Sequence, residues 1–86
     1  MYVVECYWPG VTEEALAETL ARTRAAALQL RNEGRSVELR GTILLRNDET
    51  VFCLFDGDER DVRAAGELGG MRLERVLESV WLEPAG

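Results

Sequence analysis

The segment Val37–Phe55 decides the fold of this chain, and it reads VELRGTILLRNDETVFCLF. Two runs rich in β-branched and aromatic residues flank the polar turn Arg46–Glu49, which is the pattern of a β-hairpin. The turn contains no glycine, so a four-residue loop built on a type I turn is expected rather than a primed two-residue turn. The pattern predicts two antiparallel strands, at 36–46 and 50–56, around which the rest of the chain is arranged.

A strand and a long helix precede this hairpin. Tyr2–Trp8 is rich in valine and aromatic residues and predicts a strand, which Pro9-Gly10 ends. Thr12 can cap a helix that runs to Asn32, because no Gly or Pro interrupts the segment and apolar residues recur every three or four positions. The buried face of this helix is expected to consist of Leu16, Leu20, Thr23, Ala27 and Leu30.

A second helix and a fourth strand follow the hairpin. Asp58 is a candidate N-cap, and Gly69-Gly70 end the helix that it begins. Leu73–Glu83 predicts the fourth strand, which Pro84 closes. The order βαββαβ predicts an α+β fold, a single ferredoxin-like domain spanning 1-86. In this fold an antiparallel sheet of order 4-1-3-2 carries both helices on one face.

Alternation along the strands divides their residues between a helix-covered face and an open face. The helix-covered face is expected to hold Val4, Cys6, Val37, Leu39, Ile43, Leu45, Val51, Cys53, Phe55, Leu77 and Trp81. The open face is expected to hold Val3, Glu5, Tyr7, Glu38, Arg40, Thr42, Leu44, Phe52, Leu54, Val76, Glu78 and Val80. Gly41 interrupts the apolar set of its strand, which is typical of a bulge or of a close approach by a helix. As a core residue, Trp81 is expected to cost about 3–5 kcal/mol of stability when replaced by Ala.

The expected open face is too apolar to be left in contact with water, and a patch of this kind usually marks an interface. We therefore expect a homodimer, joined either sheet to sheet or edge to edge through the second or the fourth strand. The same face carries the candidate ligand-binding residues, which are Glu5, Tyr7, Glu38, Arg40, Phe52 and Glu78. Carboxylates beside an arginine and aromatic rings could line a small-molecule pocket between two subunits. The alternative is that they are rim charges, some of them paired across the dimer.

Composition excludes several classes of function. The chain has 16 acidic residues, 10 basic residues that are all Arg, and no His, for a net charge of −6. An acidic chain without an Arg cluster repels phosphate backbones, so no nucleic acid partner is expected. No apolar run approaches the ~18 residues that a membrane span needs, and no signal peptide precedes the first strand, so we expect a cytoplasmic protein with no membrane partner. Cys6 and Cys53 lie in apolar strand patterns, and we expect them to pack as small hydrophobic residues.

Several short motifs occur together along the chain: Tyr2-Val3-Val4-Glu5, Trp8-Pro9-Gly10, Phe52-Cys53-Leu54-Phe55, Val62-Arg63, Gly70 and Glu74-Arg75-Val76. Together they resemble a family of small bacterial ferredoxin-like domains that includes an actinobacterial nickel-binding protein. The resemblance implies a binding protein that takes nickel or another divalent metal. In the middle strand the family carries an aromatic residue, a His two residues on, and a Ser-Tyr pair. Those columns here hold Leu39, Gly41, Thr42 and Ile43, so the imidazole that a borderline metal favours is missing.

Two classes of function follow from these observations. The first is a small dimeric non-enzymatic binding protein, for a metal or a small molecule, with its pocket on the open face. The alternative is a dimeric α+β barrel enzyme of the oxygenase or isomerase kind that acts on a small molecule. In that enzyme the acid–base and anion-binding roles would fall to Tyr7, Arg40 and either Glu5 or Glu78. Fold analogy alone supports the enzyme, and the sequence assigns no catalytic residue and no metal ligand.

Overall fold

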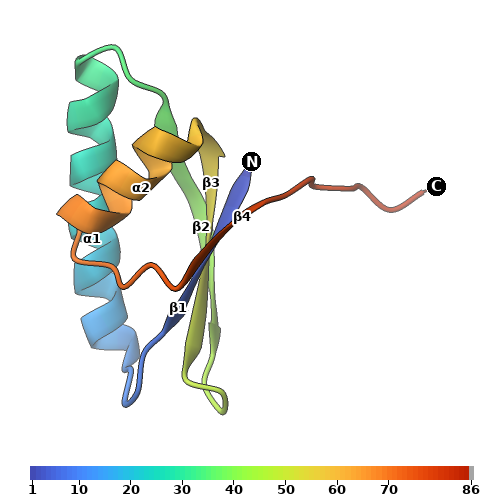
Figure 1. The fold of residues 1–86 in the computed structure, drawn as a ribbon. Coiled ribbons are helices and arrows are strands. Elements are labelled where there is room, and N and C mark those ends of the chain that lie inside the picture. The colour runs from blue at the N-terminus through green and yellow to red at the C-terminus, as the bar shows by residue number, and fades with distance from the viewer. Residues whose placement is uncertain (86) are drawn as a thin grey trace.

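The computed structural model describes residues 1–85 of the chain. Its elements follow in the order β1 (Tyr2–Tyr7), α1 (Glu13–Asn32), β2 (Val37–Leu45), β3 (Thr50–Gly57), α2 (Glu59–Leu68) and β4 (Arg75–Glu78). The fold is α+β, with a four-stranded antiparallel sheet of order β2-β3-β1-β4. Both helices lie on one side of this sheet (Figure 1). The predicted order of elements and of strands is confirmed.

The local signals around α1 act as the sequence predicts. The Thr12 hydroxyl oxygen accepts a hydrogen bond from the backbone N–H of Ala15 at 3.1 Å, which caps the helix. Gly34 follows the helix with a φ of +84°, a conformation that glycine adopts without strain. Within residues 1–85, neither helix has the length and apolar character needed to cross a membrane.

The core lies between the sheet and the two helices. The buried face of α1 consists of Leu16, Thr19, Thr23, Ala26, Ala27 and Leu30. From the sheet, Val4, Cys53 and Phe55 are fully buried against this layer. Val62 and Ala65 of α2 close the core at one end and are also fully buried. Burial of this apolar surface is the main force that holds the helices on the sheet.

A bulge in β2 shifts the pairing between β2 and β3. Leu39 lies opposite Phe55 of β3. The next pair joins Gly41 to Leu54, so Arg40 is an extra residue on β2 without a counterpart on β3. Because side chains alternate with a period of two, one extra residue sends every later side chain to the other face of the sheet. The bulge, one of the two features that Gly41 indicates in the sequence, is present.

The bulge overturns the predicted placement of residues 42–45. Ile43 and Leu45, expected beneath the helices, lie on the open face, where they are 51% and 40% exposed. Thr42 and Leu44, expected on the open face, lie on the helix side, where Leu44 packs against the core. The hydroxyl of Thr42 donates to the buried Sγ of Cys53 at 3.8 Å. The prediction is wrong here because it carries one alternation straight through the bulge.

β4 is shorter than predicted, and its alternation is reversed. Val76, expected on the open face, lies opposite Val4 and packs against the core. Leu77, expected under the helices, lies opposite Val3 on the open face. Glu78, also expected on the open face, lies opposite Tyr2 on the helix side of the sheet and is exposed.

Beyond β4 the chain leaves the sheet (Figure 1). The backbone N–H of Ser79 donates to the carbonyl of Met1 at 2.9 Å, and within the described chain β1 offers no partner past this point. Val80, Trp81 and Leu82 are 78%, 66% and 81% exposed. Trp81 is therefore not a core residue, and the large loss of stability predicted for Trp81→Ala has no basis in packing within the chain.

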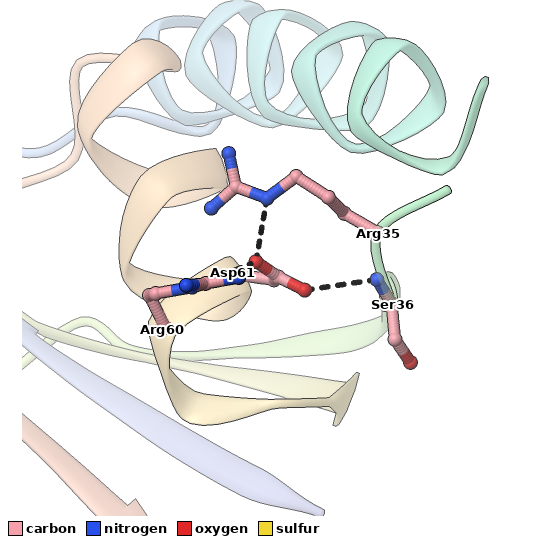
Figure 2. Close-up of polar contacts among 4 residues, drawn as sticks. All are labelled: Arg35, Ser36, Arg60 and Asp61. Carbon is pink, nitrogen blue, oxygen red and sulfur yellow. Dashed lines mark hydrogen bonds and ion pairs between the residues drawn. The ribbon is translucent and has the colours of Figure 1, made fainter. Parts of the chain in front are cut away.

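A buried carboxylate joins α2 to the connection between α1 and β2 (Figure 2). Asp61 is 2% exposed and accepts hydrogen bonds from Arg35 Nε at 2.7 Å and from the backbone N–H of Ser36 at 2.9 Å. The hydrogen bond from Ser36 and the guanidinium of Arg35 lower the pKa of Asp61, although burial acts in the opposite direction. These contacts fix the start of α2 against the segment that leads into β2.

Replacing Asp61 by Asn should lower the melting temperature, because the neutral amide loses the ion pair with Arg35 and its single acceptor oxygen cannot accept from both Arg35 Nε and the Ser36 N–H. Asp58→Asn is the matched control, since Asp58 occupies the N-cap of the same helix but its side chain makes no capping hydrogen bond. Thermal unfolding near neutral pH should show a fall of at least about 5 °C for Asp61→Asn and a smaller change for Asp58→Asn.

The sign of the pH dependence follows from the lowered pKa of Asp61. A carboxyl group whose pKa is lower in the folded state stabilises the protein fully above its unfolded pKa, and that stabilisation is lost as the pH falls through the folded pKa. The difference in melting temperature between the native chain and Asp61→Asn should therefore shrink below the ordinary Asp pKa of 3.8. A difference that stays constant down to strongly acidic pH would contradict this role of Asp61.

Candidate functional site

The open face is the side of the sheet that neither helix covers (Figure 1). Its apolar and aromatic residues are Val3, Tyr7, Ile43, Leu45, Phe52, Leu54 and Leu77. Tyr7, like Ile43, is 51% exposed, and Leu77 is 38% exposed. Strands spaced ~4.8 Å apart with a rise of ~3.3 Å per residue give this face dimensions of roughly 19 by 20 Å. The chain thus leaves a broad apolar surface uncovered.

One ion pair interrupts the apolar surface of the open face. Glu5 of β1 lies between Phe52 of β3 and Arg75 of β4. Arg75 Nε donates to Glu5 Oε1 at 2.6 Å, and the Glu5 side chain is 23% exposed. This hydrogen bond lowers the pKa of Glu5 and raises the pKa of Arg75. The pair therefore stays ionised across the neutral pH range.

The partner of Glu5 differs from the one that the sequence predicts. Glu78, expected beside Glu5, lies opposite Tyr2 instead, because the alternation of β4 is reversed. The position beside Glu5 belongs to Arg75, which the sequence reasoning did not select. One property of the sequence could have indicated Arg75. A partly buried carboxylate such as Glu5 needs a cationic neighbour, and the motif Glu74-Arg75-Val76 contains one.

A second group of charges lies at the edge of the sheet. Arg40 Nη1 is 3.2 Å from Glu38 Oε1, and Arg40 Nε is 3.5 Å from Asp56 Oδ2. All three side chains are more than half exposed, and ion pairs of this kind contribute little to stability. Asp56 follows Phe52 by four positions along β3, a distance of about 13 Å. Glu38 and Arg40 therefore lie apart from the group that contains Glu5 and Phe52.

A groove of about 550 Å³ runs over this edge of the open face. Gly41 and Leu54 form its floor, and Trp81 of the tail forms part of its wall. A Cβ atom built on Gly41 would meet only the Leu54 Cδ1 atom, at 4.0 Å. The bulge therefore turns position 41, where the resembling family carries its His, toward an open space on the open face.

The residues present do not fit a nickel site. Among residues 1–85, no three His, Cys, Asp or Glu side chains come close enough together to hold a metal ion. The charged residues that line the groove are Arg40, Asp56 and Glu83, and Asp56 already pairs with Arg40. Carboxylates without imidazole are poor ligands for a borderline metal such as nickel.

The two cysteines lie on the helix-covered face. Cys6 and Cys53 are free thiols, 4% and 0% exposed. Burial raises the pKa of Cys6 to about 12 and that of Cys53 to about 11. Both thiols are therefore protonated at neutral pH, and neither is a nucleophile or a thiolate ligand. Their predicted role as small hydrophobic residues is confirmed.

Neither cysteine should react with an aromatic disulfide reagent in the native state at about pH 8, because both thiols are buried and protonated. In denaturant the same sample should release one chromophore for each of Cys6 and Cys53, which provides the internal control. Rapid reaction of either thiol in the native protein would show that the helix layer does not cover it.

Comparisons with models of known families, with curated proteins and with solved structures find no match for this chain. The function is therefore inferred from the open face and the contacts described above.

Proposed function

We propose that this protein is a small homodimeric, non-enzymatic binding protein. In this proposal the open faces of two copies pack against each other and hold a small molecule between the sheets. The observation that supports this proposal is the broad apolar face, which the chain itself leaves uncovered. Surfaces of this kind on small proteins usually mark an interaction site.

The size of the open face supports a stable interface. A standard interface buries about 800 Å² per partner. The face measures roughly 19 by 20 Å in projection, and protruding side chains increase its accessible area. The exposed tail residues Val80, Trp81 and Leu82 add further apolar surface that a partner can cover. The open face alone covers about 380 Å² in projection, so the dimer also needs the tail as part of its interface.

The charges on the open face are compatible with a second copy of the chain as the partner. The chain as a whole carries a net charge of −6, yet charges of both signs pair on this face. Glu5 pairs with Arg75, and Arg40 pairs with Glu38 and Asp56. A two-fold axis brings the same patch of both subunits together, so paired charges meet paired charges without strong repulsion.

Sheet-to-sheet packing is favoured over joining at the strand edges. The side chains of Ile43 and Leu45 on β2 and of Leu77 on β4 belong to the open face, so an edge contact would leave them in water. Two sheets that pack face to face lie ~10 Å apart, with their side chains interdigitated. Glu5 and Arg75 would then be the main polar groups between the sheets and could orient a bound small molecule.

The ferredoxin-like sandwich is the fold we infer for the chain. The strand order β2-β3-β1-β4, with both helices on one side, supports this assignment. The resemblance to the nickel-binding family is a further support for a binding role. Nickel is not part of the proposal, because the residues present do not fit a metal site.

The alternative of a dimeric α+β barrel enzyme receives less support from the geometry. A general acid or base works best when its pKa lies near the working pH. The pKa of Glu5 instead moves away from neutrality, because Arg75 stabilises the carboxylate. Glu78, the other candidate, lies on the opposite side of the sheet.

A matched pair of substitutions tests the dimer. Ile43 on the open face and Leu28 on α1 are equally exposed in the single chain, at 51% and 52%. We expect light scattering after size exclusion to show a dimer for the native protein and for Leu28→Asp. Ile43→Asp should be a monomer, because each copy would bury an unpaired carboxylate at the interface. A monomeric native protein, or a dimer that survives Ile43→Asp, would contradict the proposal.

Native mass spectrometry of the purified protein, without added ligand, tests the binding role. A dimer that carries a bound mass would support a pocket between the sheets, and the mass would indicate the class of ligand. A dimer without bound mass would identify the open face as an assembly surface only.

A further inference from the structure

A cavity lies on the other side of the sheet, between α1 and the strands. Its volume is about 230 Å³. β1, β3 and α1 form its walls, and the loop between α2 and β4 closes one side. In Figure 1 this loop, drawn in orange, runs from the end of α2 back to the sheet. The cavity is therefore separate from the surface that we assign to the dimer.

The strand side of this cavity is apolar, whereas polar and charged side chains of α1 and of the loop before β4 complete its lining. Cys6, Val51 and Cys53 of the strands form the floor, and both thiols carry no charge at neutral pH. Trp8 and Met71 form the sides. An aromatic ring, a thioether and small apolar side chains suit the apolar body of a small molecule.

Two guanidinium groups lie at the mouth of the cavity. Arg22 is held in place because its Nε donates to the Gly69 carbonyl at 3.3 Å and its Nη2 donates to the Thr19 hydroxyl at 3.1 Å. A guanidinium has five N–H donors, so Arg22 keeps several of them for a ligand. Arg72, from the loop before β4, is the second guanidinium.

Neither of these arginines has an acidic partner in the described part of the chain. None of the ion pairs within residues 1–85 involves Arg22 or Arg72, although the chain has 16 acidic residues for 10 arginines. Glu5 and Glu74 are the negative charges whose effect reaches Cys6 on the floor. Glu5 is already paired with Arg75, and Glu74 is exposed. The mouth of the cavity is therefore cationic, whereas its floor is apolar.

We propose that this cavity binds a small organic anion, namely a monocarboxylate whose apolar body is about the size of one aromatic ring. The carboxylate pairs with Arg22 and Arg72, and the body lies against Trp8 and Met71. An apolar cavity of about 150 Å³ holds benzene, so the larger volume here leaves room for a ring and a carboxylate. An inorganic anion would leave the partly exposed side chains of Trp8 and Met71 in contact with water. This inference does not depend on the dimer.

The two tryptophans allow the site to be observed directly. Trp8 lines the cavity, whereas Trp81 lines the groove on the open face, together with Gly41 and Leu54. Comparison with Trp81→Phe assigns the two indole N–H signals in a nitrogen–proton NMR spectrum. Phenylacetate should shift the Trp8 signal saturably and leave the Trp81 signal in place. Phenylacetamide, its neutral analogue, should bind at least about tenfold more weakly, because its amide has no negative charge to pair with the guanidinium groups and one acceptor oxygen in place of two.

A substitution tests whether the anion uses the guanidinium of Arg72. Arg72→Gln should weaken phenylacetate binding about tenfold, and the rest of the spectrum reports whether the fold is intact. Arg24→Gln is the matched control, because Arg24 also lacks an ion pair within residues 1–85 but lies outside the cavity. Binding to Arg24→Gln should be unchanged.

Three results would overturn the proposal: no saturable shift of Trp8, equal affinity for the acid and the amide, or equal weakening by Arg24→Gln and Arg72→Gln. Ile43→Asp should retain phenylacetate binding whatever its oligomeric state. A failure of the cavity proposal is therefore distinguishable from a failure of the dimer proposal.

Discussion

The bulge at Arg40 in β2 is the constraint on which the rest of the structure depends. Before the bulge, Val37 and Leu39 are buried against the helices. After it, Leu44 takes over this role, and Ile43 and Leu45 move to the open face. Without the extra residue Ile43 and Leu45 would lie under α1, and Thr42 and Leu44 would lie on the open face. One inserted residue thus sets both the packing of the core and the apolar character of the uncovered face.

Neighbouring residues of the inner strand β1 contribute to the two opposite faces of the sheet. Glu5 projects to the open face, where it pairs with Arg75, and Cys6 projects to the floor of the cavity under α1. Alternation along a strand makes this division possible, because successive side chains point to opposite faces. The helices complete one side only, and Asp61 holds α2 in place there through Arg35 and Ser36. The molecule therefore offers two chemically different surfaces, one broad and apolar, the other enclosed and cationic at its mouth.

Local sequence signals were sufficient for the elements and their order. The polar turn at 46–49, the Thr12 cap and the glycine after α1 each act over a few residues, so their effects can be predicted without tertiary structure. The side of the sheet to which each side chain points was harder to predict for β2 and β4. In β2, a glycine indicates a bulge but does not identify the extra residue. In the last strand, apolar residues stand side by side at 76–77 and at 80–81, and either alternation fits them. The cavity could not be predicted, since its volume depends on how the loop before β4 packs against α1.

Nuclear Overhauser contacts from the Ile43 methyl group test the bulge most directly. Ile43 is the single isoleucine of the chain, so its δ1 methyl group gives one resolved signal. With the bulge, Ile43 lies opposite Phe52, and its methyl group should show contacts to the Phe52 ring and none to α1. Contacts from Ile43 to Leu16 or Leu20 would show an uninterrupted alternation and would contradict this account of the open face.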